Sequence, residues 1–131
     1  MIFIDANVFL AYDNTRDLLH KRAVKLWLQI EAGDFGECFT SDYVLNEVVG
    51  VTYRKLGKKR AVILGDRVQK SIPILNIDAN ILKKAWILFT KTTSKLNLVD
   101  CTNVIALQTF KANTLATFDK EFSKMKIEIV N

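Results

Sequence analysis

Four acidic residues stand at points of the sequence where carboxylates could do chemistry. Asp5 directly follows the apolar run MIFI, Glu47 lies in LNEVV, Asp100 in LVDCTNV, and Asp119 directly after TLATF. If they converge, like charges about 4 Å apart repel by ~1–4 kcal/mol per pair, so the cluster requires a cation or raised pKa values. Oxygen ligands without His or Cys suit Mg²⁺ or Mn²⁺. Such an ion activates water and neutralises a phosphoryl transition state, which predicts a metal-dependent phosphodiesterase.

Each acid also has a purely structural interpretation. Asp5 and Asp119 are residue types that serve as turn or cap residues, and Asp100 could be the N-cap of a helix. Glu47 falls at the rim of an apolar helix face, where a solvated side chain is common. Asn103, one turn after Asp100, could serve the same pocket as the acids. The residues alone leave both interpretations open.

The elements that must position these side chains follow from the apolar pattern. Strands are expected at residues 1–5, 37–41, 71–77, 114–118 and 126–130. Helices are expected at about 16–32, 42–57, 58–70 and 79–91, with a further helix starting near residue 100. Strands separated by helices need right-handed crossovers, which predicts a three-layer α/β/α sandwich with a mainly parallel sheet of about five strands. Because parallel strands share a carboxyl edge, Asp5 and Asp119 are expected at that edge.

The length and composition indicate one ordinary globular domain. The chain has 131 residues, half of them hydrophobic and a quarter charged, so we expect a single domain over residues 1–131. Cys38 and Cys101 have no CxxC spacing, which favours reduced thiols over a disulfide or a zinc site. No apolar stretch approaches the ~18 residues that span a bilayer, and the start lacks a secretory pattern. We therefore expect a cytoplasmic protein with no membrane partner.

The charge balance favours an anionic partner. The formal net charge is +5, from 19 basic and 14 acidic residues. An excess of this kind favours a polyanion such as nucleic acid. Five basic side chains gather in one stretch: Arg54, Lys55, Lys58, Lys59 and Arg60. They are either the solvated end of a helix or a contact to a phosphate backbone.

Four short motifs follow one another along essentially the whole chain: IFIDANVF, LNEVV, LVDCTNVIAL and LATFDKEF. Their order and separation resemble the PIN-domain family, and within it the VapC-type ribonuclease toxins of toxin–antitoxin pairs. Each motif alone is weak, whereas the ordered set is specific. The resemblance implies the same α/β/α sandwich, cleavage of RNA with Mg²⁺ or Mn²⁺ by an activated water, a homodimer, and silencing by a small antitoxin.

The resemblance also implies roles for particular residues. The family's acidic quartet, which is both catalytic and metal-binding, matches four positions: Asp5, Glu47, Asp100 and Asp119. Asn7 matches the polar residue two after the first acid, and Thr117 matches a frequent hydroxyl position two before the last. These two side chains would orient ligands or water.

Three alternatives differ in class. A phosphoacceptor signalling domain also combines acids, Mg²⁺ and a parallel sheet, but it needs adjacent acids after the first strand, where this chain has Asp-Ala-Asn. A PIN-like module that binds RNA or protein without catalysis is compatible with the motifs. A PIN nuclease of RNA processing or quality control would keep the chemistry without the toxin context.

Overall fold

The computed structural model describes residues 1–131, and its centre is a five-stranded sheet in which all pairs are parallel. The strands are β1 (Ile2–Ile4), β2 (Cys38–Ser41), β3 (Ile74–Leu75), β4 (Thr114–Ala116) and β5 (Glu128–Val130). Their order across the sheet is β3-β2-β1-β4-β5. The predicted parallel α/β architecture is therefore confirmed.

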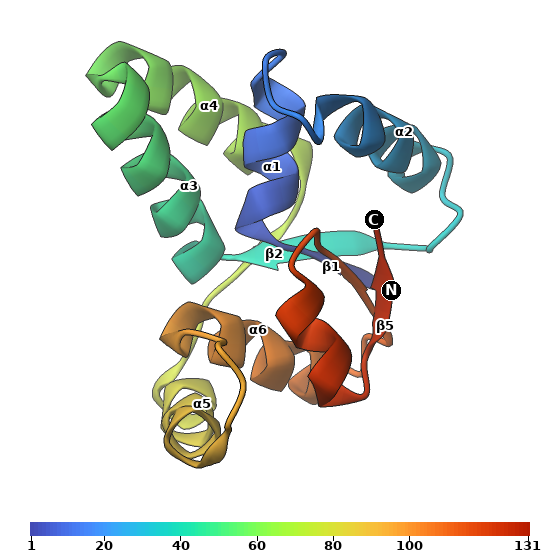
Figure 1. Ribbon diagram of the computed structural model, residues 1–131, viewed down its shortest axis with the longest axis vertical. Helices are drawn as coiled ribbons and strands as arrows, with labels where there is room; N and C mark the ends of the chain where they lie inside the picture. The colour runs from blue at the N-terminus through green and yellow to red at the C-terminus, as the bar shows by residue number, and fades with distance from the viewer.

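Helices cover both faces of the sheet (Figure 1). They are α1 (Ala6–Asp13), α2 (His20–Glu31), α3 (Asp42–Leu56), α4 (Lys58–Ser71), α5 (Ala79–Lys91), α6 (Leu98–Thr109) and the short 3-10 helix η1 (Lys120–Met125). In Figure 1, α1 to α4 lie on one side of the sheet, and α5, α6 and η1 lie on the other. None of the helices is both long and apolar enough to span a membrane.

The central strand β1 and its neighbour β4 are buried on both faces. All three residues of β1 and all three of β4 are buried, in keeping with a parallel sheet between two helix layers. One apolar cluster of 26 buried residues joins these strands to the helices. The strand ends that follow this rigid core are therefore fixed positions for side chains.

Several helix boundaries follow the capping chemistry of the sequence. Ser41 caps α3 by accepting from the backbone N–H of Val44 at 3.2 Å, and Asp78 caps α5 by accepting from Ile81 at 2.8 Å. Gly57, with a φ of +80°, separates α3 from α4 in the left-handed region that favours glycine. The segments predicted at 42–57, 58–70 and 79–91 are helices with nearly those bounds.

Three segments differ from the prediction. Residues 6–13 form α1, a helix that the apolar pattern does not reveal because its buried residues do not follow a single stripe. The helix expected over 16–32 is α2, which begins only at His20. The third predicted strand shortens to the two residues of β3, at the edge of the sheet.

Candidate active site

The strand order of the sheet reverses between β1 and β4, which are paired neighbours. In the order β3-β2-β1-β4-β5, the chain builds outward from β1 to one side and then returns to place β4 on the other. Open α/β sheets bind ligands beside this reversal, outside the carboxyl ends of the strands. Asp5 directly follows β1 and Thr117 directly follows β4. The backbone N–H of Asp5 donates to the carbonyl of Ala116 at 3.1 Å, which joins the two strand ends.

Asp5 is buried at this edge and accepts four hydrogen bonds. Its Oδ1 accepts from the backbone N–H of Ala6 (2.8 Å) and from Nδ2 of Asn103 (3.2 Å). Its Oδ2 accepts from Nδ2 of Asn7 (2.7 Å) and from Oγ1 of Thr117 (2.8 Å). Burial raises the pKa of Asp5 to about 7, although the Thr117 and Ala6 bonds act in the opposite direction. The carboxylate is thus held rigidly and is buried, a setting in which a cation would stabilise its charged form.

Thr117 and Asn7 tie the first acid to the last. The Thr117 hydroxyl, besides donating to Asp5, accepts from Nδ2 of Asn7 at 2.9 Å and from the backbone N–H of Asp119 at 3.1 Å. Oδ1 of Asn7 accepts from the backbone N–H of Phe118 at 3.0 Å. Asp119 itself caps η1 through its Oδ1. The structure therefore brings Asn7 and Thr117 into one network with Asp5, and Asp119 beside them.

Asp100 lies in the first turn of α6 rather than at its cap. Asn97 is the N-cap: its side chain accepts from the backbone N–H of Asp100 at 2.9 Å, and Oδ2 of Asp100 accepts from the backbone N–H of Asn97 at 2.7 Å. The N-cap interpretation of Asp100 is therefore wrong, because the helix begins two residues earlier, at Leu98. Burial, with added repulsion from Glu47 and Asp119, raises the pKa of Asp100 to about 6.

Glu47 reaches the same edge from α3. Burial raises its pKa, while the charge of Arg54 lowers it. The charges of Asp100 and Glu47 both raise the pKa of Asp5, and those of Glu47 and Asp119 raise the pKa of Asp100. The four predicted acids therefore lie near enough to one another for each to repel at least one other.

The donor set fits a small hard cation, although no three His, Cys, Asp or Glu side chains converge on one point as they stand. Mg²⁺ is usually held by one or two carboxylates and keeps several waters, so it does not require a tight protein cage. Oδ1 of Asn103 is the one buried side-chain polar atom without a hydrogen-bond partner, and its own amide group contacts Asp5. An oxygen atom left unpaired beside a buried carboxylate is consistent with a site that gains a further polar group.

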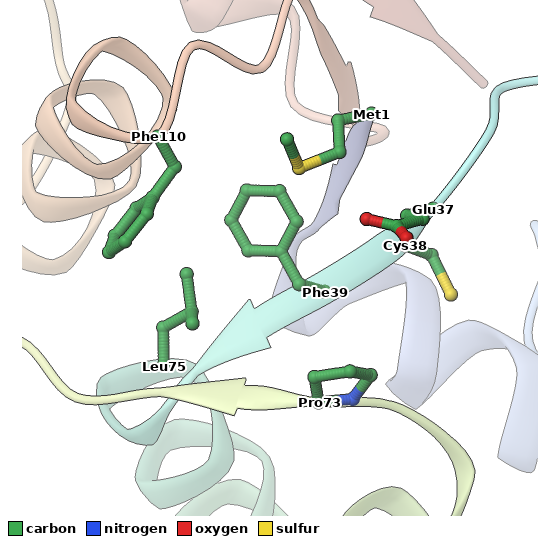
Figure 2. A pocket seen from close by; sticks show the side chains of 7 residues that line it. All are labelled: Met1, Glu37, Cys38, Phe39, Pro73, Leu75 and Phe110. Atoms are coloured by element: carbon green, nitrogen blue, oxygen red, sulfur yellow. The ribbon is translucent and has the colours of Figure 1, made fainter.

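The largest cavity of the molecule lies elsewhere. It measures about 440 Å³, lies along β2 and β3, and is lined by Met1, Glu37, Cys38, Phe39, Pro73, Leu75 and Phe110. Figure 2 shows its apolar side chains around Phe39, with Glu37 as the single charged group. A smaller cavity of about 320 Å³ borders Glu47 instead. None of the four acids therefore lines the largest cavity.

Two further residues act on these acids: Asn97, which was not among the predicted residues, and Arg54, which was predicted only as part of the basic stretch. Asn97 fixes one oxygen of Asp100, and its signal was the Asn-x-x-Asp spacing of a capping box. Arg54 affects Glu47 from two helical turns away, and its signal was the seven-residue separation on α3, which returns to the same helix face.

The likeness to known proteins agrees with this architecture. No curated protein has a matching sequence. Among solved structures, VapC20 of Mycobacterium tuberculosis, described as a sarcin-ricin loop cleaving toxin, superposes with a TM-score of 0.86 at 22% identity, covering 97% of this chain and 96% of that one. A toxin–antitoxin complex from Klebsiella pneumoniae gives 0.67 at 19%, with 100% and 97% coverage. VapBC2 from Rickettsia felis, bound to a promoter DNA fragment, gives 0.71 at 17%, with 100% and 98% coverage.

At these identities the likeness to solved structures shows the fold. The family is shown by the sequence itself, since the sequence profile of the PIN domain matches residues 2–128, nearly the whole chain. That span contains all four acids of the carboxyl edge, and the chain belongs to the PIN-domain family.

Proposed function

We propose that residues 1–131 form a single nuclease domain, a metal-dependent endoribonuclease that serves as the toxin of a toxin–antitoxin pair. The observation that carries this proposal is the set of four carboxylates at the strand reversal of a PIN fold, each of which repels at least one other. Repulsion among these carboxylates lowers the stability of the folded chain, and a bound cation would compensate for it. The toxin context is supported by the VapC and toxin–antitoxin structures that share the fold.

The catalytic and metal-binding roles belong to the four acids: Asp5, Glu47, Asp100 and Asp119. When bound, Mg²⁺ or Mn²⁺ supplies positive charge to the phosphoryl transition state and activates the attacking water. Thr117 and Asn7 hold Oδ2 of Asp5 in one orientation. The Asn97 backbone holds Oδ2 of Asp100, so Oδ1 is the oxygen available to a ligand or to water.

The proposed partners are RNA, a small antitoxin and a second copy of the chain, all in the cytoplasm. Large apolar side chains are exposed on α3, α4 and α5, and they would be covered by protein partners: Tyr53, Leu56, Val62, Ile63, Trp86, Ile87 and Phe89. Light scattering of the purified chain tests the homodimer. Co-purification with the product of a short adjacent reading frame tests the antitoxin.

The cleavage test compares the purified chain with charge-matched variants. Labelled RNA is incubated with Mg²⁺ or Mn²⁺, with EDTA, and with Asp5→Asn or Asp100→Asn. Asp34→Asn is the control, because this exposed aspartate lies in the loop before β2, at the other edge of the sheet. We expect cleavage by the wild type and the control alone, and only with metal.

The outcomes separate the alternatives. Cleavage that survives both EDTA and the two site substitutions would contradict the mechanism. RNA binding without cleavage of any RNA would favour the non-catalytic PIN-like module. Metal-dependent cleavage without an antitoxin partner would favour a nuclease of RNA processing or quality control.

A further inference from the structure

The cavity beside Glu47 is lined by aromatic, amide and basic side chains as well as by this one acid. It measures about 320 Å³ and is lined by Tyr43, Asn46, Glu47, Gly50, Arg54 and Val99. Glu47 is the one lining residue that belongs to the acidic set, and its charge acts on both Asp5 and Asp100. A volume near the lower end of small-ligand sites matches one nucleotide rather than a protein segment.

Five of the lining residues form a single stripe along α3. Tyr43, Glu47 and Arg54 are separated by four and seven residues, spacings that return to the same face of a helix. The stripe therefore runs from an aromatic ring, past the proposed metal ligand, to a guanidinium group. Its remaining members, Asn46 and Gly50, are an exposed amide and a residue without a side chain.

Gly50 allows Arg54 to lie back along the stripe. A Cβ atom placed on Gly50 would be 3.4 Å from Nη1 of Arg54, so the guanidinium group packs over the glycine. Gly50 is three residues beyond Glu47, about 4.5 Å along the helix axis. The positive group thus stands within about one helical turn of the acid, and it has no salt-bridge partner among the acidic side chains.

An aromatic ring and a free guanidinium group on one helix face are a combination with which proteins bind single-stranded RNA. Proteins bind single strands by stacking bases on aromatic side chains and by contacting phosphates with arginine, whose planar fork matches two phosphate oxygens. An acidic site repels its own anionic substrate, so a cation at its margin is needed to hold the neighbouring phosphate. The four carboxylates cannot supply that contact.

We propose that the cavity lined by α3 is the subsite for the nucleotide next to the scissile phosphate, with Arg54 binding its phosphate and Tyr43 stacking on its base. This inference rests on the proposed ribonuclease function, because it assigns the substrate-binding part of the same groove. Asn46 lies between the two and offers an amide to the base edge. Arg54 and Tyr43 are then binding residues rather than members of the catalytic set.

The test measures binding apart from cleavage. The parent is Asp100→Asn, in which the amide oxygen can still accept from the Asn97 backbone, and the probe is a fluorescein-labelled single-stranded RNA of mixed sequence. Fluorescence anisotropy gives the affinity over a range of salt concentrations. Arg54→Ala is expected to weaken binding about 10-fold, as expected for the loss of a charge-assisted contact. It should also lower the slope of log affinity against log salt by about 0.7.

Three further variants separate the two contacts. Arg54→Lys should keep the salt slope and recover part of the affinity, because it retains the charge and loses the planar fork. Tyr43→Leu should weaken binding roughly 5-fold or more with an unchanged slope, and Tyr43→Phe should retain the affinity. Lys111→Ala is the matched control and should change neither value, because this exposed lysine lies in the loop before β4, at the amino-terminal edge of the sheet.

The outcomes for this subsite are independent of the outcomes for cleavage. An Arg54→Ala protein with the affinity and salt slope of its parent, or a parent that does not bind the RNA, would overturn the subsite. If the wild type cleaves RNA while Arg54→Ala binds normally, the nuclease stands and the subsite falls. If nothing cleaves but binding depends on Arg54 and Tyr43, the two RNA contacts stand and the nuclease falls.

Discussion

Replacing Asp5 with asparagine should stabilise the metal-free protein at alkaline pH while removing its activity. Burial raises the pKa of Asp5 from 3.8 to about 7, so the folded chain holds a proton that the unfolded chain has already released. The free energy of unfolding therefore falls as the pH rises through this window, and the loss is complete above pH 7. In Asp5→Asn this contribution is absent.

The size of the effect follows from the structure. At about 1.4 kcal/mol per pKa unit, the difference between 3.8 and about 7 amounts to about 4 kcal/mol, of which about 3 kcal/mol is lost between pH 5 and pH 8. Asparagine keeps one acceptor oxygen for Ala6 and Asn103 but places an amide group against Asn7, which costs about 1–2 kcal/mol in lost hydrogen bonds. The variant should therefore be more stable than the wild type by about 2 kcal/mol at pH 8, and should lose this advantage at pH 5.

Urea denaturation in EDTA, followed by tryptophan fluorescence at pH 5, 6, 7 and 8, measures this difference. Asp34→Asn, an exposed aspartate, is the control and should follow the wild type. Addition of Mg²⁺ at pH 8 should raise the stability of the wild type but not that of Asp5→Asn. If the wild type and Asp5→Asn change in parallel between pH 5 and pH 8, Asp5 is not a buried acid with a raised pKa, and the electrostatic reasoning fails.

Three further substitutions test the packing around the site. Gly65→Ala would place a Cβ atom 2.9 Å from a valine methyl group of α3, whereas the new Cβ of Gly50→Ala meets a flexible side chain at 3.4 Å. In urea denaturation, Gly65→Ala should therefore be less stable than Gly50→Ala by about 1–3 kcal/mol. Asp13→Asn removes the charge that holds two arginines of α4, at 2.7 and 2.9 Å, and should cost about 1–2 kcal/mol, less in 1 M salt; an equal cost at all salt concentrations would contradict an ionic role. Thr117→Val removes the hydroxyl that donates to the first acid and should weaken Mg²⁺ binding roughly 10-fold in calorimetry, with Thr117→Ser retaining it; equal affinities of the two variants would exclude this role.

The fold could be predicted because the sequence carries local signals for nearly every element. The expected helix at 79–91, capped by Asp78, has those bounds in the structure, since an N-cap aspartate and an amphipathic stripe both mark it. The acids Asp5 and Asp119 could be placed at one edge because a parallel sheet brings strand ends together whatever the strand order. That argument needs no knowledge of side-chain geometry.

The remaining features depend on tertiary contacts that no local pattern records. α1 is buried by helices on two sides, and its apolar residues therefore have no clear period. The beginning of α6 was misplaced because Asp100 resembles a cap, whereas Asn97 takes that role and Asp100 completes the capping box. The hydrogen bond from Asn103 to Asp5 joins residues 98 apart and could not be read from either motif alone.

The hydrogen bond between Thr117 and Asp5 joins residues 112 apart in the sequence, and this separation determines how long after Asp5 the ribosome adds Thr117. A ribosome that adds 5–20 residues per second takes roughly 6–22 s to pass from one to the other. During that interval β1 has no β4 beside it, and the first acid has no hydroxyl to hold it. A nascent chain that stops before residue 117 therefore contains Asp5, Glu47 and Asp100 but cannot assemble the edge that orients them. If the proposed ribonuclease function holds, incomplete products of synthesis would carry three of the four acids without the hydroxyl that orients the first.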